Sequence, residues 1–118
     1  VPRGSGLYRV FPRPGNPADD VHSTIQAIDP KTGMKRWTYR LSAPMTEAGV
    51  LTTASDVLFS GGRDGASYAL DARTGKLLWQ TNLGPSVASS PITYAINGKQ
   101  YVSVMAGNSL YTFGLRDR

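Results

Sequence analysis

Apolar and polar residues alternate along short segments of this chain, and turn-forming residues separate the segments. Residues 24–28 and 35–41 show the alternation on either side of the sequence Asp-Pro-Lys-Thr-Gly. Alternation over about four to eight residues is typical of half-buried β-strands. The pattern predicts a β-hairpin whose type I turn is closed by a G1 bulge, with Gly33 in the left-handed conformation.

The same pattern continues to the end of the chain and favours strands throughout. Asn97-Gly98 is the strongest short hairpin signal. No window keeps apolar residues at helical spacing between caps, so the fold class is all-β. A β-prone run at 7–11 leads into a proline-rich loop, and further strands are predicted at 50–53, 56–60, 67–70, 77–81, 92–96, 100–106 and 110–115.

An eleven-residue phrase occurs twice, as Ala27–Trp37 and as Ala69–Trp79, at an offset of 42 residues. Repetition near this period in strand-rich units is typical of the antiparallel four-stranded blades of a β-propeller. We therefore expect a partial propeller of about two to three blades at 23–118, after an N-terminal strand and loop at 6–22. The expected repeat units are 23–45, 46–83 and 84–118, and the third lacks a fourth strand because Gly114 stands where Asp71 would recur.

The conserved spacing within the two phrases suggests a structural role. Trp37 and Trp79 end the phrases on the last strand of each hairpin, where an indole can pack on small residues of a neighbouring blade and donate to a backbone carbonyl there. Replacing Trp79 with alanine is then expected to cost about 3–5 kcal/mol. The proposed docking residues are Ala27, Asp29, Thr32, Gly33, Trp37, Ala69, Asp71, Thr74, Gly75 and Trp79.

Composition narrows the possible functions. The net charge of +5 is spread along the chain without a basic stripe interleaved with aromatics, which argues against a nucleic-acid partner. The chain has no cysteine and no apolar run long enough for a membrane span. Residues 1–5, Val-Pro-Arg-Gly-Ser, look like the remnant of a purification tag rather than part of the fold.

No set of polar residues forms a recognisable catalytic pattern. His22 lies alone in a polar loop, so a surface histidine is expected. The Gly-Gly-Arg-Asp-Gly run at 61–65 is followed by a strand pattern rather than a helix, so it is read as a hairpin turn and not as a phosphate loop. The carboxylates of four aspartates are expected to accept hydrogen bonds from the local backbone in turns: Asp29, Asp56, Asp64 and Asp71. Three serines lack a nearby base that could make them nucleophiles: Ser86, Ser89 and Ser90.

The phrase Ala-x-Asp-x-x-Thr-Gly-x-x-x-Trp resembles the tryptophan-docking motif of the quinoprotein alcohol dehydrogenases. These are eight-bladed propellers that carry pyrroloquinoline quinone (PQQ). The stretches 48–65 and 90–107 are also similar to the C-terminal blades of that family. The resemblance covers residues 24–115.

In that family the quinone lies in the central channel with a bound calcium ion, and an aspartate acts as the base for the alcohol proton. Those ligands and that base come from earlier blades, so the resemblance implies no catalytic and no metal-binding residue here. Two family positions that line the quinone pocket correspond to Glu47 and to Gly107-Asn108. The family's tryptophans are absent at both, and only Gly107 and Asn108 are kept as candidate cofactor contacts.

The resemblance implies a C-terminal piece of a PQQ-dependent alcohol dehydrogenase, periplasmic or exported, without a tightly bound cofactor and inactive alone. The alternative is a non-enzymatic propeller that serves as a scaffold or binding module, as in outer-membrane assembly lipoproteins with similar repeats. Because incomplete blades expose strand edges and apolar faces, the expected partners are the remaining blades or other copies of the chain. Four copies of two blades each could close an eight-bladed ring.

Overall fold

The computed structural model describes residues 22–43 and 47–114. These residues form nine strands and no helix, which confirms the all-β prediction. The strand predicted at residues 7–11 lies outside the described residues. The strands are β1 (Thr24–Ile28), β2 (Lys35–Arg40), β3 (Leu51–Thr52), β4 (Val57–Gly61), β5 (Ala66–Asp71), β6 (Leu77–Asn82), β7 (Ile92–Ile96), β8 (Lys99–Ala106) and β9 (Ser109–Gly114).

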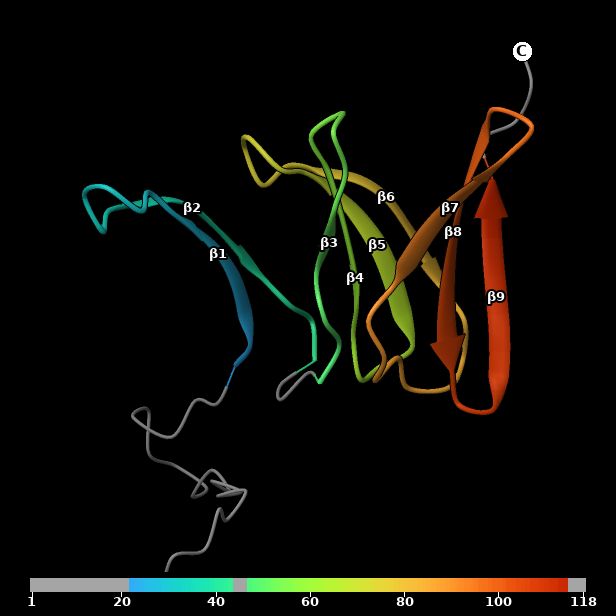
Figure 1. Cartoon of the computed structure of the whole chain (residues 1–118). Coiled ribbons are helices and arrows are strands. Elements are labelled where there is room, and N and C mark those ends of the chain that lie inside the picture. The colour runs from blue at the N-terminus through green and yellow to red at the C-terminus, as the bar shows by residue number, and fades with distance from the viewer. Residues whose placement is uncertain (1–21, 44–46, 115–118) are drawn as a thin grey trace, which may run out of the picture.

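The strands are arranged in three antiparallel sheets that follow one another along the chain (Figure 1). The first sheet pairs β1 with β2, the middle sheet has the order β3-β4-β5-β6, and the last sheet has the order β7-β8-β9. Only the middle sheet has four strands among the described residues. The arrangement is an open partial propeller, in agreement with the sequence prediction.

The two repeated phrases fold into hairpins of the same geometry. In each turn the glycine amide donates to the aspartate carbonyl at 2.8 Å, from Gly33 to Asp29 and from Gly75 to Asp71. Both glycines have the expected positive φ, +71° and +76°. The bond from the glycine amide spans one residue more than the closing bond of a type I turn. In the second phrase the Thr74 amide also donates to the Asp71 carbonyl at 3.3 Å, which is the bond of the predicted type I turn.

A β-bulge precedes each tryptophan. Ala27 pairs with Trp37 and Ile28 with Lys35, so one residue of β2 is unpaired. The same irregularity occurs between β5 and β6, where Ala69 pairs with Trp79. Because a bulge changes the direction of the side chains beside it, both indoles start from the same local geometry.

The apolar core lies between the sheets rather than within one of them. One cluster joins the first and middle sheets, with Leu70 fully buried against Trp37 and Tyr39. A second joins the middle and last sheets, with Val87 fully buried near Val104. Facing sheets that bury alternate residues against each other account for this placement.

Candidate functional site

Trp37 joins the first sheet to the middle sheet. Its Nε1 donates a hydrogen bond to the backbone carbonyl of Ala72 at 2.9 Å, 35 residues along the chain. The indole also lies on Gly75, where a Cβ atom would come within 2.6 Å of its Cε3. The Trp37 side chain therefore contacts the turn of the second phrase twice, through one hydrogen bond and one close apolar contact.

Trp79 has the same place in its hairpin but a different environment. Its ring meets Phe113 of β9 edge-on, with centroids 4.9 Å apart, and the residue remains 38% exposed. By the repeat, the counterpart of Ala72 is position 115, which lies outside the described residues. From the exposure of Trp79 we expect Trp79→Ala to cost less than the sequence suggested, and less than Trp37→Ala.

An apolar cleft of about 360 Å³ opens beside Trp79, between the middle and last sheets. Phe59, Val102 and Phe113 line it together with the indole. The sequence repeat contains no signal for this cleft, because its lining comes from two sheets that are separate in the sequence.

Ion pairs brace the two phrase turns. Asp29 accepts from the Lys31 amide and from Nη2 of Arg36, both at 2.8 Å. Asp71 accepts from the Arg73 amide at 2.9 Å and from its guanidinium. The arginine hydrogen bonds, followed by the backbone hydrogen bonds, hold the pKa of each aspartate below its ordinary value.

These lowered pKa values predict an acid-sensitive component of stability. Because both carboxylates bind protons more weakly in the folded chain, the stability they contribute is present above about pH 4 and is lost as the pH falls through the lowered values. Exposure to solvent keeps the effect modest. We expect Asp29→Asn with Asp71→Asn to flatten the fall of Tm between about pH 5 and pH 2.5. Scanning calorimetry of both proteins tests this. A Tm that falls as far in the double variant as in the wild type would contradict the prediction.

Asp56→Asn is the matched control for this experiment. Asp56 lies in a turn with φ +61°, a conformation that asparagine tolerates. Its carboxylate is 3.9 Å from Arg73, beyond hydrogen-bonding distance. The substitution removes a turn carboxylate that receives no hydrogen bond from an arginine, and so controls for the loss of a negative charge alone.

The other polar candidates occupy structural positions. Asp64 accepts from the Ala66 amide at 3.2 Å, as expected of a turn residue, and also from Oγ of Ser42 at 2.5 Å. Asp56 differs from our prediction, since its backbone carbonyl rather than its side chain accepts the hydrogen bond from the Ala72 amide. His22 is exposed.

Gly107 and Asn108, the candidate cofactor contacts, form the exposed turn between β8 and β9. The amide of Gly107 donates to the Ser86 carbonyl at 3.2 Å, and a Cβ at Gly107 would meet Pro85 at 2.8 Å. Glu47, the other position considered from the sequence, is exposed as well. The surroundings of Gly107 fit a close turn-to-loop contact.

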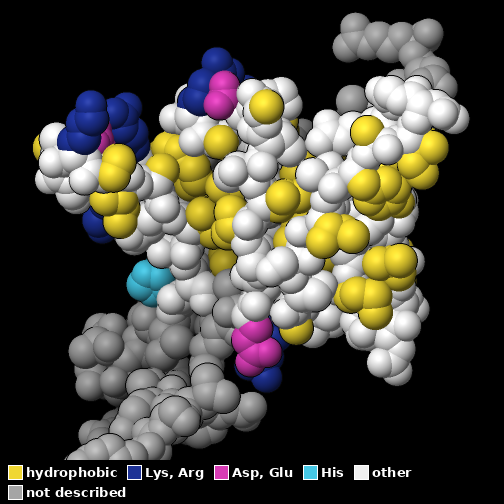
Figure 2. All heavy atoms as spheres, viewed as in Figure 1, with side chains coloured by type: hydrophobic (Ala, Val, Ile, Leu, Met, Phe, Trp, Pro, Cys, Tyr) yellow, Lys and Arg dark blue, Asp and Glu magenta, His cyan; other side chains and the backbone are white. Residues whose placement is uncertain are grey.

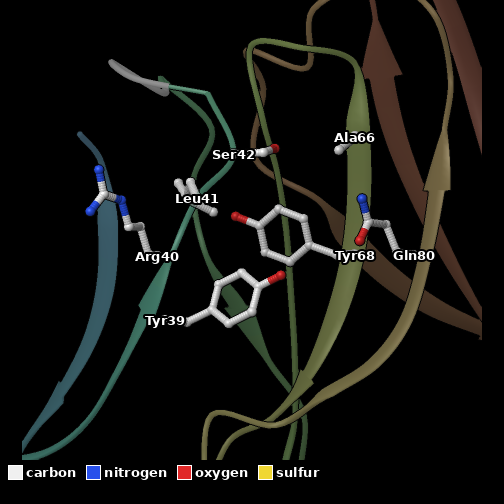
Figure 3. A pocket seen from close by; sticks show the side chains of 7 residues that line it. All are labelled: Tyr39, Arg40, Leu41, Ser42, Ala66, Tyr68 and Gln80. Carbon is white, nitrogen blue, oxygen red and sulfur yellow. The ribbon is translucent and has the colours of Figure 1, made fainter. Parts of the chain in front are cut away.

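A second cleft, of about 390 Å³, lies between β2 and β5 (Figure 3). Tyr39 and Tyr68 meet there with ring centroids 5.7 Å apart, and Leu41, Ser42 and Gln80 complete much of the lining. Burial raises the pKa of Tyr68, and a hydrogen bond with Ser60 opposes that rise. The sequence does not indicate this cleft, because both tyrosines occupy strand positions at the same alternating spacing as ordinary core residues.

The described residues offer no metal centre, because no group of three or more His, Cys, Asp or Glu side chains converges among them. They also contain no helix that is long and apolar enough to cross a membrane. What the arrangement does supply is a set of contacts between sheets, of which the Trp37 contact is the most specific.

Comparison with known proteins gives two kinds of match. The sequence model of a family described as outer membrane protein assembly factor BamB matches residues 21–117. The quinoprotein alcohol dehydrogenase PedE of Pseudomonas putida is 42% identical over 89 residues. That alignment covers 75% of this chain but only 14% of the dehydrogenase, so the chain spans a small part of its relative.

Solved structures give the same two matches. The quinohemoprotein alcohol dehydrogenase of Comamonas testosteroni superposes with a TM-score of 0.68 and 37% identity, covering 73% of this chain and 13% of that one. BamB of Moraxella catarrhalis superposes with a TM-score of 0.60 and 25% identity, covering 76% of this chain and 27% of that one. The same blades are thus found in enzymes and in an outer-membrane assembly factor.

Proposed function

This chain belongs to the family of propeller repeats shared by the assembly factor BamB and the quinoprotein alcohol dehydrogenases, and we propose that it forms blades of a PQQ-dependent alcohol dehydrogenase. In the intact protein, alcohol would be oxidised by hydride transfer to the quinone. Here the blades contribute to the propeller that surrounds the cofactor, and residues elsewhere supply the chemistry. Such an enzyme would act in the periplasm.

The identity to dehydrogenases carries this proposal. Identity is 42% to PedE and 37% to the Comamonas enzyme, against 25% to the Moraxella assembly factor. Among the described residues, no group of three or more His, Cys, Asp or Glu side chains converges. We therefore derive no step of the oxidation from this chain, and we keep Gly107 and Asn108 only as candidate contacts with the quinone.

The role proposed for the repeated phrase is docking of one blade on the next. The hydrogen bond from Trp37 to Ala72 and the contact with Gly75 support it in the first pair of sheets. The other phrase residues shape the turns: Oγ1 of Thr32 accepts from Met34, and Oγ1 of Thr74 accepts from Lys76, both at 3.2 Å. These turns present the carbonyl and the glycine on which an indole rests.

A scaffold function is the second candidate, and the match to the family described as BamB favours it. In that case the blades would bind another protein and no quinone. A dehydrogenase and a scaffold would need the same contacts between sheets, so a chimera is used to distinguish the two functions.

Grafting separates the two candidates. We expect the isolated chain to show no dye-coupled alcohol oxidation with added PQQ and calcium. We also expect that residues 24–114, substituted for the matching segment of PedE, leave its activity within roughly tenfold of the parent, about 1.4 kcal/mol in the barrier. Circular dichroism confirms that the chimera is folded. Turnover by the isolated chain, or a folded chimera without activity, would refute the proposal.

A further inference from the structure

The hairpin between β7 and β8 turns on two residues, Asn97 and Gly98. β7 ends at Ile96 and β8 begins at Lys99, and these two residues pair across the turn. Asn97 has φ +51° and Gly98 has φ +77°, as the central residues of a type I′ turn require. Both are exposed at the end of the last sheet (Figure 1). The turn needs the glycine for its conformation, and the asparagine places a reactive amide next to it.

The side-chain amide of Asn97 and the backbone nitrogen of Gly98 are the groups that can join in a five-membered ring. Within the described residues neither group makes a hydrogen bond, since the two residues lie between the paired strands and outside the ladder. No atom lies within 4 Å of the position that a Cβ of Gly98 would take. Because the glycine has no side chain and the space around it is open, its nitrogen is accessible to Cγ of Asn97.

Asn82 shows the opposite situation, in which both reacting groups are held. Its Nδ2 donates to the Asp64 carbonyl at 3.2 Å, and its Oδ1 accepts from the Gly84 amide at 2.8 Å. The nitrogen that would attack Asn82 belongs to Leu83, whose amide donates to the Gly65 carbonyl at 2.8 Å. The Leu83 side chain also packs on the core between the middle and last sheets. The fold therefore protects Asn82.

Asn108 is intermediate between Asn97 and Asn82. It lies in the exposed turn between β8 and β9, but the next residue, Ser109, is the first of β9 and pairs with Ala106. The attacking nitrogen thus belongs to the ladder, and the serine side chain stands beside it. The three asparagines of the described residues form a graded series within one chain.

We propose that Asn97 is a site of spontaneous deamidation, for which the chain supplies both reacting groups. The Gly98 nitrogen forms a bond to Cγ of Asn97, the bond from Cγ to Nδ2 breaks, and ammonia leaves with the proton of the Gly98 amide. Water then opens the cyclic succinimide at one of its two carbonyls, so position 97 becomes aspartate or isoaspartate. No oxidant or cofactor takes part, and the proposal does not depend on the dehydrogenase assignment.

The two products differ in their effect on the turn. Asp-Gly suits a type I′ turn as Asn-Gly does. In isoaspartate the main chain runs through Cβ and gains one atom between positions 97 and 98. The pairing of Ile96 with Lys99 then cannot be kept with the same turn, because hairpin register depends on turn type and loop length.

Either product also adds a negative charge to a sheet that carries almost no charge. Lys99 is the only Lys, Arg, Asp or Glu between residues 85 and 114. Figure 2 shows apolar and uncharged side chains over the visible face of the last sheet, with the charged side chains elsewhere. The net charge at pH 7 falls by one unit, from +5 to +4, and cation-exchange chromatography can resolve this change.

Ageing of the full chain tests the proposal. We expect incubation in mildly alkaline buffer at physiological temperature to deamidate Asn97 at least about tenfold faster than Asn108 and Asn82. Peptide mapping by mass spectrometry identifies the position, and chromatography separates the aspartyl from the isoaspartyl peptide. Equal rates at the three positions, or an Asn97 that stays intact, would overturn the proposal. Aspartate as the sole product would overturn it as well, because direct hydrolysis forms no ring.

Asn97→Gly is the matched variant, because Gly-Gly also suits a type I′ turn. Its circular dichroism spectrum should be like that of the wild type, and ageing should not produce the species of lower charge.

Hydroxylamine provides the second measurement, since it attacks a succinimide and cleaves the chain there. From the folded wild type we expect fragments 1–97 and 98–118, whereas Asn97→Gly should stay whole. A wild-type chain that hydroxylamine leaves whole would show that no ring forms at this turn.

Discussion

Trp37→Ala is expected to lower the free energy of unfolding by about 3 kcal/mol, the lower end of the range for a core aromatic, because the indole is partly buried. The substitution removes the indole that packs against the cluster of Leu41, Leu58 and Leu70. It also removes the 2.9 Å hydrogen bond to the Ala72 carbonyl. Because the indole joins the two-stranded first sheet to the middle sheet, urea denaturation followed by circular dichroism should show both the lower midpoint and early loss of β1 and β2.

Trp79→Ala is the comparison that makes this prediction specific. Trp79 is 38% exposed and its main aromatic partner is Phe113, so we expect a loss of about 1–2 kcal/mol. Met34→Ala, at a 68% exposed position, should change stability by less than about 0.5 kcal/mol. Equal losses for the two tryptophans would show that docking on Gly75 and Ala72 adds nothing to the stability of the chain.

The fold was predictable because its signals are local. Asn97 and Gly98 have φ of +51° and +77°, which a two-residue hairpin of type I′ requires, and the sequence pair alone indicates this. The period of 42 residues and the alternation along each strand likewise fix the hairpins. Strand ends differ by at most one residue from those predicted, as at β3, where only Leu51 and Thr52 pair.

The environments of repeated residues were not predictable in the same way. Trp37 and Trp79 occur in nearly identical phrases, yet one indole is bonded to the next turn and the other borders a cleft. The difference depends on which segment packs beside each hairpin, and that segment lies 35 residues from Trp37. For the same reason the sequence did not indicate the cleft at Tyr39 and Tyr68.

Gly75→Ala is expected to destabilise the chain by about 3 kcal/mol, because two costs add. A left-handed residue with a Cβ costs about 1–2 kcal/mol, and φ at Gly75 is +76°. The new Cβ would also lie 2.6 Å from the Trp37 ring, so the indole must move and its hydrogen bond to Ala72 must weaken.

Gly33→Ala separates these two costs. Gly33 has nearly the same φ, +71°, in the same kind of turn, but no atom lies within 4 Å of the position of its Cβ. It should therefore cost only the backbone strain, about 1–2 kcal/mol. In a Trp37→Ala background the cost of Gly75→Ala should fall to that of Gly33→Ala, a coupling of about 1–2 kcal/mol in urea denaturation. If Gly75→Ala and Gly33→Ala lower the free energy of unfolding equally in the wild type, Gly75 is needed for its own turn and not for the indole of Trp37. The repeated spacing from glycine to tryptophan would then need another physical reason.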